Sequence, residues 1–172
     1  MEKIADPLSV TRKGLSEAAE PSSRVVEKTS ENDVFRLVTA EAEKVMKLFK
    51  KLRDTSAHEE YKRVSLLKES EDRILFLNRR EEEYLYPVTE IITEGNELLF
   101  QSMQENKSIE SLLAELEKAP KDGPDFEYKV EALISEVSAH VEREKKELFP
   151  KLNAAIPEAE AAMLGEQFSR RR

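Results

Sequence analysis

The sequence predicts an all-α protein built around an antiparallel up-down four-helix bundle. Charged residues make up 37% of the 172 residues and glycine occurs only 4 times, a composition typical of long amphipathic helices. Along four stretches of the chain, apolar residues recur at steps of three and four, which is the spacing of one helix face. Short breaks rich in proline, glycine and small polar residues separate these stretches, and short connections favour antiparallel neighbours.

The apolar periodicity and the breaks give approximate bounds for each element. Four long helices are expected at about 33–53, 57–85, 96–118 and 125–148, with a short fifth helix at about 157–168. Ser30–Asp33 offers an N-cap for the first helix, and Thr55-Ser56 is expected to end that helix and to cap the second. Pro87 and Pro150 are expected to end the second and fourth helices, and Pro157 to begin the fifth.

These elements divide the chain into three parts. Residues 1–31 form a polar N-terminal arm, residues 32–152 the bundle, and residues 153–172 a C-terminal helix with a basic tail. The third helix is expected to turn the following side chains into the core: Leu99, Met103, Asn106, Ile109, Leu113 and Leu116.

Charge and composition argue against several classes of partner. The net charge of −8 disfavours nucleic acid, because phosphate binding needs a basic surface. The absence of cysteine excludes disulfides and thiolate metal sites. No apolar run approaches the ~20 residues of a membrane span, and the N-terminus has no hydrophobic signal core. We therefore expect a cytoplasmic protein that binds a protein partner or self-associates, and that contacts neither nucleic acid nor membrane.

The two halves of the bundle sequence match each other. Leu85-Tyr86-Pro87 corresponds to Leu148-Phe149-Pro150, and the same shift along the chain pairs Glu81 with Glu144. Nearly the same shift aligns the apolar stripe of the first helix with that of the third. The matched glutamates and Leu-aromatic-Pro stops predict an internal repeat of two related helical hairpins.

The only two histidines of the chain lie in different surroundings. His58 stands at the polar start of the second helix beside Glu59 and Glu60, so we expect it to be exposed and without a role. His140 lies on the apolar stripe of the fourth helix, with Glu144 one turn later on the same face. The pair of His140 and Glu144 is therefore the one that calls for a chemical explanation.

Glu81 occupies the inward position on the second helix that matches Glu144 on the fourth. We expect Glu81, His140 and Glu144 to converge inside the bundle. A carboxylate there needs a proton, a cation or a metal, and one imidazole with two carboxylates suits iron, manganese or zinc. The alternative is a buried polar network in which both glutamates hydrogen-bond His140 and no metal is present.

At these residues the sequence resembles a known family. His140-x-x-x-Glu144 followed by Leu148-Phe149-Pro150 is similar to the last motif of hemerythrin-like, or HHE cation-binding, domains. Glu81 followed by Leu85-Tyr86-Pro87 is similar to the second motif, and the resemblance covers about 33–150. It implies a non-haem di-iron centre held by one histidine from each of the first and third helices. The second and fourth helices would each add His-x-x-x-Glu.

Half of the ligand set that the resemblance implies is missing from this sequence. The three absent histidines fall on Ala42, Leu77 and Asn106. Glu41 and Glu105 are adjacent to inward positions and are expected to face sideways. The metal ligands that remain are Glu81, His140 and Glu144.

This ligand set predicts a hemerythrin-like protein that has lost the di-iron centre, binds no cofactor and acts as a structural or protein-interaction module. The alternative is a protein that binds non-haem iron or another divalent metal at the three remaining ligands, for oxygen or redox sensing or for iron handling. The chain has no cysteine nucleophile, no phosphate-binding glycine loop and no Ser-His-Asp set, so we expect no enzymatic activity.

Overall fold

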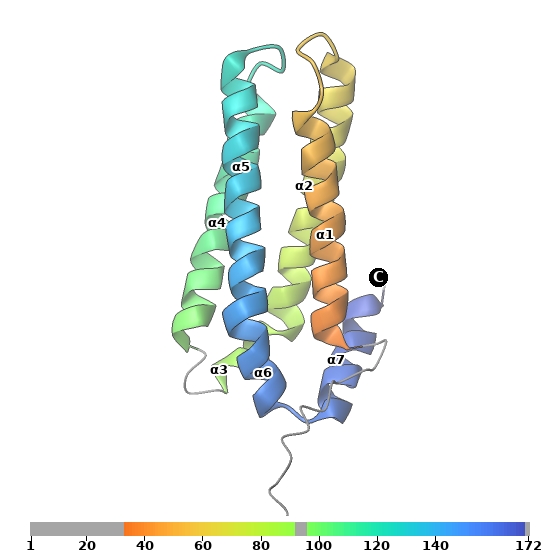
Figure 1. Cartoon of the computed structure of the whole chain (residues 1–172), viewed down its shortest axis with the longest axis vertical. Coiled ribbons are helices and arrows are strands. Elements are labelled where there is room, and N and C mark those ends of the chain that lie inside the picture. Colours follow the sequence, from red (N-terminus) through yellow and green to blue (C-terminus); the bar gives the residue numbers. More distant parts are fainter. Residues whose placement is uncertain (1–32, 92–95, 171–172) are drawn as a thin grey trace, which may run out of the picture.

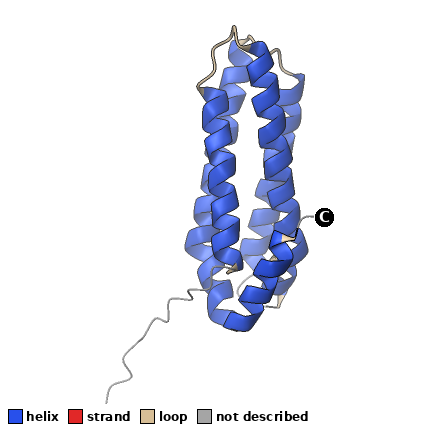
Figure 2. Cartoon of the chain, turned by 90° about the vertical axis from the view of Figure 1, so that its right-hand side faces the viewer, coloured by secondary structure: helices blue, strands red, loops and turns tan. Residues whose placement is uncertain are grey.

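The computed structural model describes residues 33–91 and 96–170 (Figures 1 and 2). Over these residues the chain is helical and forms no strand. The N-terminal arm at 1–31 lies outside the described residues. The long helices are α1 (Val34–Arg53), α2 (Glu60–Tyr84), α4 (Asn96–Lys118) and α5 (Pro124–Arg143). The predicted all-α bundle is confirmed.

The chain runs up and down the bundle twice (Figure 1). The α1–α2 and α4–α5 loops lie together at the top of the view, and the shorter elements lie at the other end. These shorter elements are α3 (Tyr86–Glu90), the π-helical turn η1 (Glu144–Leu148), α6 (Phe149–Ala155) and α7 (Glu158–Ser169). The last of them, α7, packs beside α1.

Capping residues fix both ends of α1. The Asp33 carboxylate accepts a hydrogen bond of 2.8 Å from the backbone N–H of Phe35, as expected of an N-cap. At the other end the Thr55 hydroxyl donates to the Leu52 carbonyl. The prediction that Thr55-Ser56 also caps the second helix is wrong, because the N-cap of α2 is Glu59. The Glu59 carboxylate instead accepts from the backbone N–H of Ser56 and tightens the loop.

One apolar core runs through the bundle and continues under α6 and α7. On α4 the side chains predicted to face the core are buried, with one exception. Met103 was expected inside but is 40% exposed, and Ser102 takes the buried place. Both Ser102 and Met103 lie three or four residues from Leu99 and from Asn106. The helical periodicity alone therefore does not show which of the two is buried. The side chains around this position, described below, are polar, and they suit the small hydroxyl of Ser102 in place of the thioether of Met103.

Of the two prolines, Pro87 marks the end of its helix as predicted and Pro150 does not. The second helix, α2, ends at Tyr84, and Pro87 lies near the start of the separate short helix α3. Pro150 instead lies in α6, and a helical path continues through it to Ala155. A proline inside a helix lacks the N–H and crowds the carbonyl four residues earlier. The chain accommodates Pro150 with the wider π-helical turn η1, in which the N–H of Phe149 donates to the Glu144 carbonyl.

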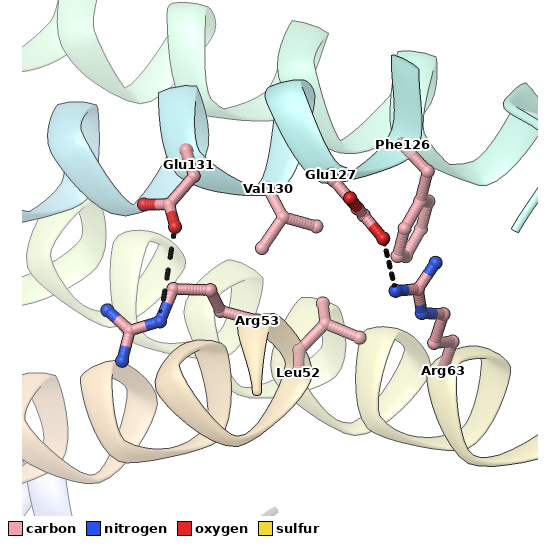
Figure 3. Close-up of a pocket in the computed structure, with 7 residues that line it drawn as sticks. All are labelled: Leu52, Arg53, Arg63, Phe126, Glu127, Val130 and Glu131. Carbon is pink, nitrogen blue, oxygen red and sulfur yellow. Dashed lines mark hydrogen bonds and ion pairs between the residues drawn. The ribbon is translucent and has the colours of Figure 1, made fainter. Parts of the chain in front are cut away.

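A buried arginine, Arg63, which Figure 3 draws, joins the two loops at the top of the bundle. Arg63 is 1% exposed, and its guanidinium donates to the hydroxyl and carbonyl oxygens of Thr55 and to the Lys121 carbonyl. It also pairs with Glu127 at 2.8 Å and lies over the Phe126 ring. The pocket in Figure 3 is lined by residues of α1, α2 and α5, and the contacts between these residues hold the three helices together.

A second buried arginine holds α7 at the other end of the bundle. The Arg80 guanidinium donates to the carbonyl oxygens of Gln167, Phe168 and Arg170, which close the C-terminal end of α7. It also lies 4.8 Å from the centre of the Tyr84 ring. A cation at a helix C-terminus satisfies carbonyls that have no partner within the helix. Arg80 therefore anchors α7 to α2.

We expect Arg80→Met to loosen α7 and to lower the free energy of unfolding by about 2–4 kcal/mol, since hydrogen bonds to charged groups contribute roughly 1.5–3 kcal/mol each. Urea unfolding measures the loss, and amide hydrogen exchange locates it in α7. The matched control is Arg79→Met, because Arg79 is the exposed neighbour on the same helix. Equal exchange rates in α7 for the two variants would contradict the anchoring role of Arg80.

Candidate metal centre

The structure brings the three predicted ligands together near the lower end of the bundle. Glu81 lies in the last turn of α2, His140 near the end of α5, and Glu144 at the first position of η1. Each is at most 2% exposed. One ligand atom from each side chain lies within 4.8 Å of the other two. His58, in contrast, is exposed in the α1–α2 loop, as expected.

The imidazole of His140 faces both carboxylates without bonding to either. Its Nε2 is 4.0 Å from Oε2 of Glu81 and 3.6 Å from Oε2 of Glu144. Both distances are too long for a hydrogen bond. Oε2 of Glu81 and Oε1 of Glu144 have no hydrogen-bond partner at all. The metal-free network in which both glutamates hydrogen-bond His140 therefore does not describe this geometry.

The other ring nitrogen of His140 is held by Glu105. Nδ1 lies 2.8 Å from Oε2 of Glu105, and the Arg143 guanidinium pairs with both oxygens of the same carboxylate. A carboxylate only accepts hydrogen bonds, so Nδ1 carries a proton, and in the neutral imidazole the lone pair of Nε2 faces Glu81 and Glu144. A histidine that binds a metal commonly has its other ring nitrogen held by a carboxylate in this way.

The prediction that Glu105 faces sideways is wrong. Its side chain is 18% exposed and reaches across the seam between α4 and α5. Sequence position alone places Glu105 next to the inward Asn106, at the edge of the helix face. The rotation of α4 against α5 and the attraction of Arg143 direct it toward His140.

Burial dominates the electrostatics of the two carboxylates. It raises the pKa of Glu81 well above its ordinary value, and the nearby charge of Glu144 raises it further. Burial also raises the pKa of Glu144, while His140, the Ser102 hydroxyl and Arg143 act in the opposite direction. The site therefore favours whatever reduces its negative charge, either a bound proton or a bound cation.

Two more polar side chains lie at this level, and of these sequence reasoning placed only Asn106 in the site, at the position of a missing histidine. Tyr86 is buried, and the charges of Glu81 and Glu144 add to the effect of burial in raising the pKa of its phenol. The Asn106 amide nitrogen donates to the Tyr86 hydroxyl at 3.0 Å. One signal for Tyr86 was available, since it aligns with Phe149 in the predicted internal repeat and differs only by its hydroxyl.

The positions where the resemblance expects further histidines are all inside the bundle. Ala42 and Leu77 are 2% exposed and belong to the apolar core. Asn106 is 1% exposed and polar. Hydrophobic packing thus fills the positions on α1 and α2, whereas the position on α4 keeps a side chain with ligand atoms.

The fold and the buried histidine–carboxylate group define a helical bundle with a candidate metal centre. The sequence model of the hemerythrin HHE cation-binding domain matches residues 31–152, more than half of the chain. The chain therefore belongs to the hemerythrin HHE cation-binding domain family. No curated protein and no solved structure matches it. No helix among the described residues is long and apolar enough to cross a membrane.

The raised pKa of Glu81 predicts how the stability of the metal-free protein depends on pH. The folded state holds this proton more tightly than the unfolded state, whose carboxyl pKa is about 4.3. The group's contribution to stability is fully present below that value and is lost as the pH rises through the higher folded pKa. We expect Glu81→Gln to reduce this loss.

The measurement is urea unfolding of the metal-free wild type and Glu81→Gln protein over a pH series that begins near pH 4. Glu90→Gln is the control, because Glu90 is exposed. The prediction fails if the wild type and the Glu81→Gln variant lose stability equally as the pH rises.

Proposed function

We propose that this hemerythrin-family bundle binds a single divalent metal ion, with iron as the ion that the family implies. The protein ligands are Glu81, His140 and Glu144. The observation that carries the proposal is the orientation of His140. Its Nδ1 is bonded to Glu105, and its Nε2 faces two carboxylates that each have an oxygen without a hydrogen-bond partner.

The chemistry of this donor set fits a divalent cation. Two carboxylates and one imidazole suit iron, manganese or zinc, and a cation would offset the charge that burial makes unfavourable. Arg143 offsets this charge only without direct contact, because its guanidinium is paired with Glu105. Iron bound here would supply one-electron redox chemistry, which suits iron handling or the sensing of oxygen or redox state.

The filled positions on α1 and α2 argue for one metal ion instead of two. Ala42 and Leu77 offer no ligand atoms and are packed in the core. This packing supports the first part of our sequence prediction, the loss of the di-iron centre. The second part, a metal-free structural or protein-interaction module, is the competing hypothesis that the next experiment tests.

We expect metal-free wild-type protein, reconstituted with Fe²⁺ without oxygen and freed of excess metal, to retain one iron per chain. His140→Ala and Glu144→Gln should retain none, because each removes a ligand. His58→Ala is the matched control, since it removes the other histidine, which is exposed, and it should bind iron like the wild type. Elemental analysis gives the stoichiometry.

Wild-type protein that retains no iron, and that is not stabilised by Mn²⁺ or Zn²⁺ in thermal unfolding, would support the metal-free module. A metal at 100 times its dissociation constant should stabilise the fold by about 2.7 kcal/mol, so thermal unfolding with and without the metal detects binding. Equal iron loss in His58→Ala and His140→Ala would also contradict the proposed site.

Glu105 is expected to act as a positioning residue for His140. Glu105→Leu removes the acceptor of the Nδ1 proton and should weaken metal binding by about 10–100-fold, the usual effect of removing a second-shell partner. Glu105→Gln keeps an acceptor oxygen and should lose less. Metal titration gives the affinities, and the imidazole nitrogen resonances of His140 report its tautomer.

The control for these variants is Glu110→Leu, on the exposed face of the same helix. A tautomer of His140 that is unchanged in Glu105→Leu would show that Glu105 does not orient the ring.

A further inference from the structure

The helix α4 directs a short polar stretch toward the metal site. Glu105 bonds to His140, and the Ser102 hydroxyl lies beside Glu144, where it opposes the rise of the carboxyl pKa. Asn106 follows Ser102 by one helical turn, so the two share a face of α4. Asn106 and Ser102 are both 1% exposed. This face of α4 therefore borders the site with polar side chains.

One end of the Asn106 amide is satisfied and the other is not. Nδ2 donates to the Tyr86 hydroxyl, while Oδ1 is buried and has no partner. Tyr86 itself lies close enough to Glu81 and Glu144 for their charges to act on its phenol. A buried amide oxygen without a partner is uncommon and calls for a ligand.

We propose that Oδ1 of Asn106 is a fourth protein ligand of the metal ion and makes the site oxygen-rich. This inference rests on the proposed function above. The donors are then one imidazole nitrogen and the oxygens of two carboxylates and one amide. Carboxylate and carbonyl oxygens suit hard divalent cations such as Mn²⁺, whereas each added imidazole shifts a site toward Zn²⁺ and Cu²⁺. The site accordingly favours Mn²⁺ relative to Zn²⁺ more strongly than the same site with a histidine at this position.

Three substitutions at Asn106 separate a ligand from a packing residue. Asn106→Leu has no donor atom, and we expect it to weaken Mn²⁺ binding by about tenfold or more. Asn106→Asp keeps an oxygen at the same place and should bind Mn²⁺ at least as tightly as the wild type. Asn106→His should lower the dissociation constant for Zn²⁺ relative to that for Mn²⁺ by about tenfold.

The readouts are Mn²⁺ titration followed by electron paramagnetic resonance, competition with Zn²⁺, and urea unfolding of each metal-free variant. The metal-free Asn106→Leu protein is expected to lose some stability, because the buried Tyr86 hydroxyl loses its hydrogen bond from Asn106. A purely structural role predicts this loss of stability with an unchanged Mn²⁺ affinity, so the affinity decides between the two roles.

Ser70 provides a control for the loss of a buried polar side chain. It is a fully buried serine of α2 that lies 11 residues, about 16 Å along the helix, from Glu81. Ser70→Ala removes a polar group from the same core and is expected to leave Mn²⁺ affinity close to that of the wild type. A comparable loss of affinity in Ser70→Ala and Asn106→Leu would overturn the assignment of Asn106 as a ligand.

The outcomes distinguish this inference from the proposed function. If the wild type binds metal and His140→Ala does not, but Asn106→Leu binds Mn²⁺ like the wild type, only the role of Asn106 is refuted. If Asn106→Leu and Asn106→Asp weaken binding equally, the residue is not an oxygen ligand. If the wild type binds no divalent metal, the proposed function itself fails.

Discussion

Two carboxylates lie side by side in the core of this bundle, where water does not reach them. Removing a charged group from water costs several kcal/mol even after the protein relaxes around it. Arg143 is directed to Glu105, so neither Glu81 nor Glu144 has a cationic side chain bonded to it. Around the pair, Glu105 bonds to Nδ1 of His140, and the Asn106 amide bonds to the Tyr86 hydroxyl.

The helices change their geometry directly after these ligands. Glu144 is the first residue of the π-helical turn that precedes Pro150, and Glu81 precedes the break between α2 and α3 at Pro87. A π-turn adds one residue to a helical turn and shifts the direction of the side chains that follow. The two prolines thus each lie six residues after a candidate ligand, at the point where the helix geometry changes. The fold and the site are coupled at this end of the bundle.

The sequence predicted the bundle and the convergence of Glu81, His140 and Glu144. Apolar periodicity and the match between the two halves are both visible in the sequence without knowledge of how the helices pack. It did not predict the contact between Glu105 and His140, which depends on how α4 is rotated against α5. The choice between Met103 and Ser102 failed for a related reason, since both fit the same helical spacing. Features set by the packing of one helix against another leave no trace in the periodicity of either helix.

The distribution of polar and apolar residues around the site is itself an argument for one metal ion. Ala42 and Leu77 close the site from α1 and α2 with well-packed side chains that need no partner. A metal-free core would be more stable with apolar residues at Glu81 and Glu144 as well, because a buried charge without a partner is unfavourable whereas apolar packing is not. Glu81 and Glu144 each keep an oxygen without a hydrogen-bond partner, and both carboxylates face Nε2 of His140. A single ion bound here would satisfy carboxylate oxygens that the protein alone leaves unsatisfied.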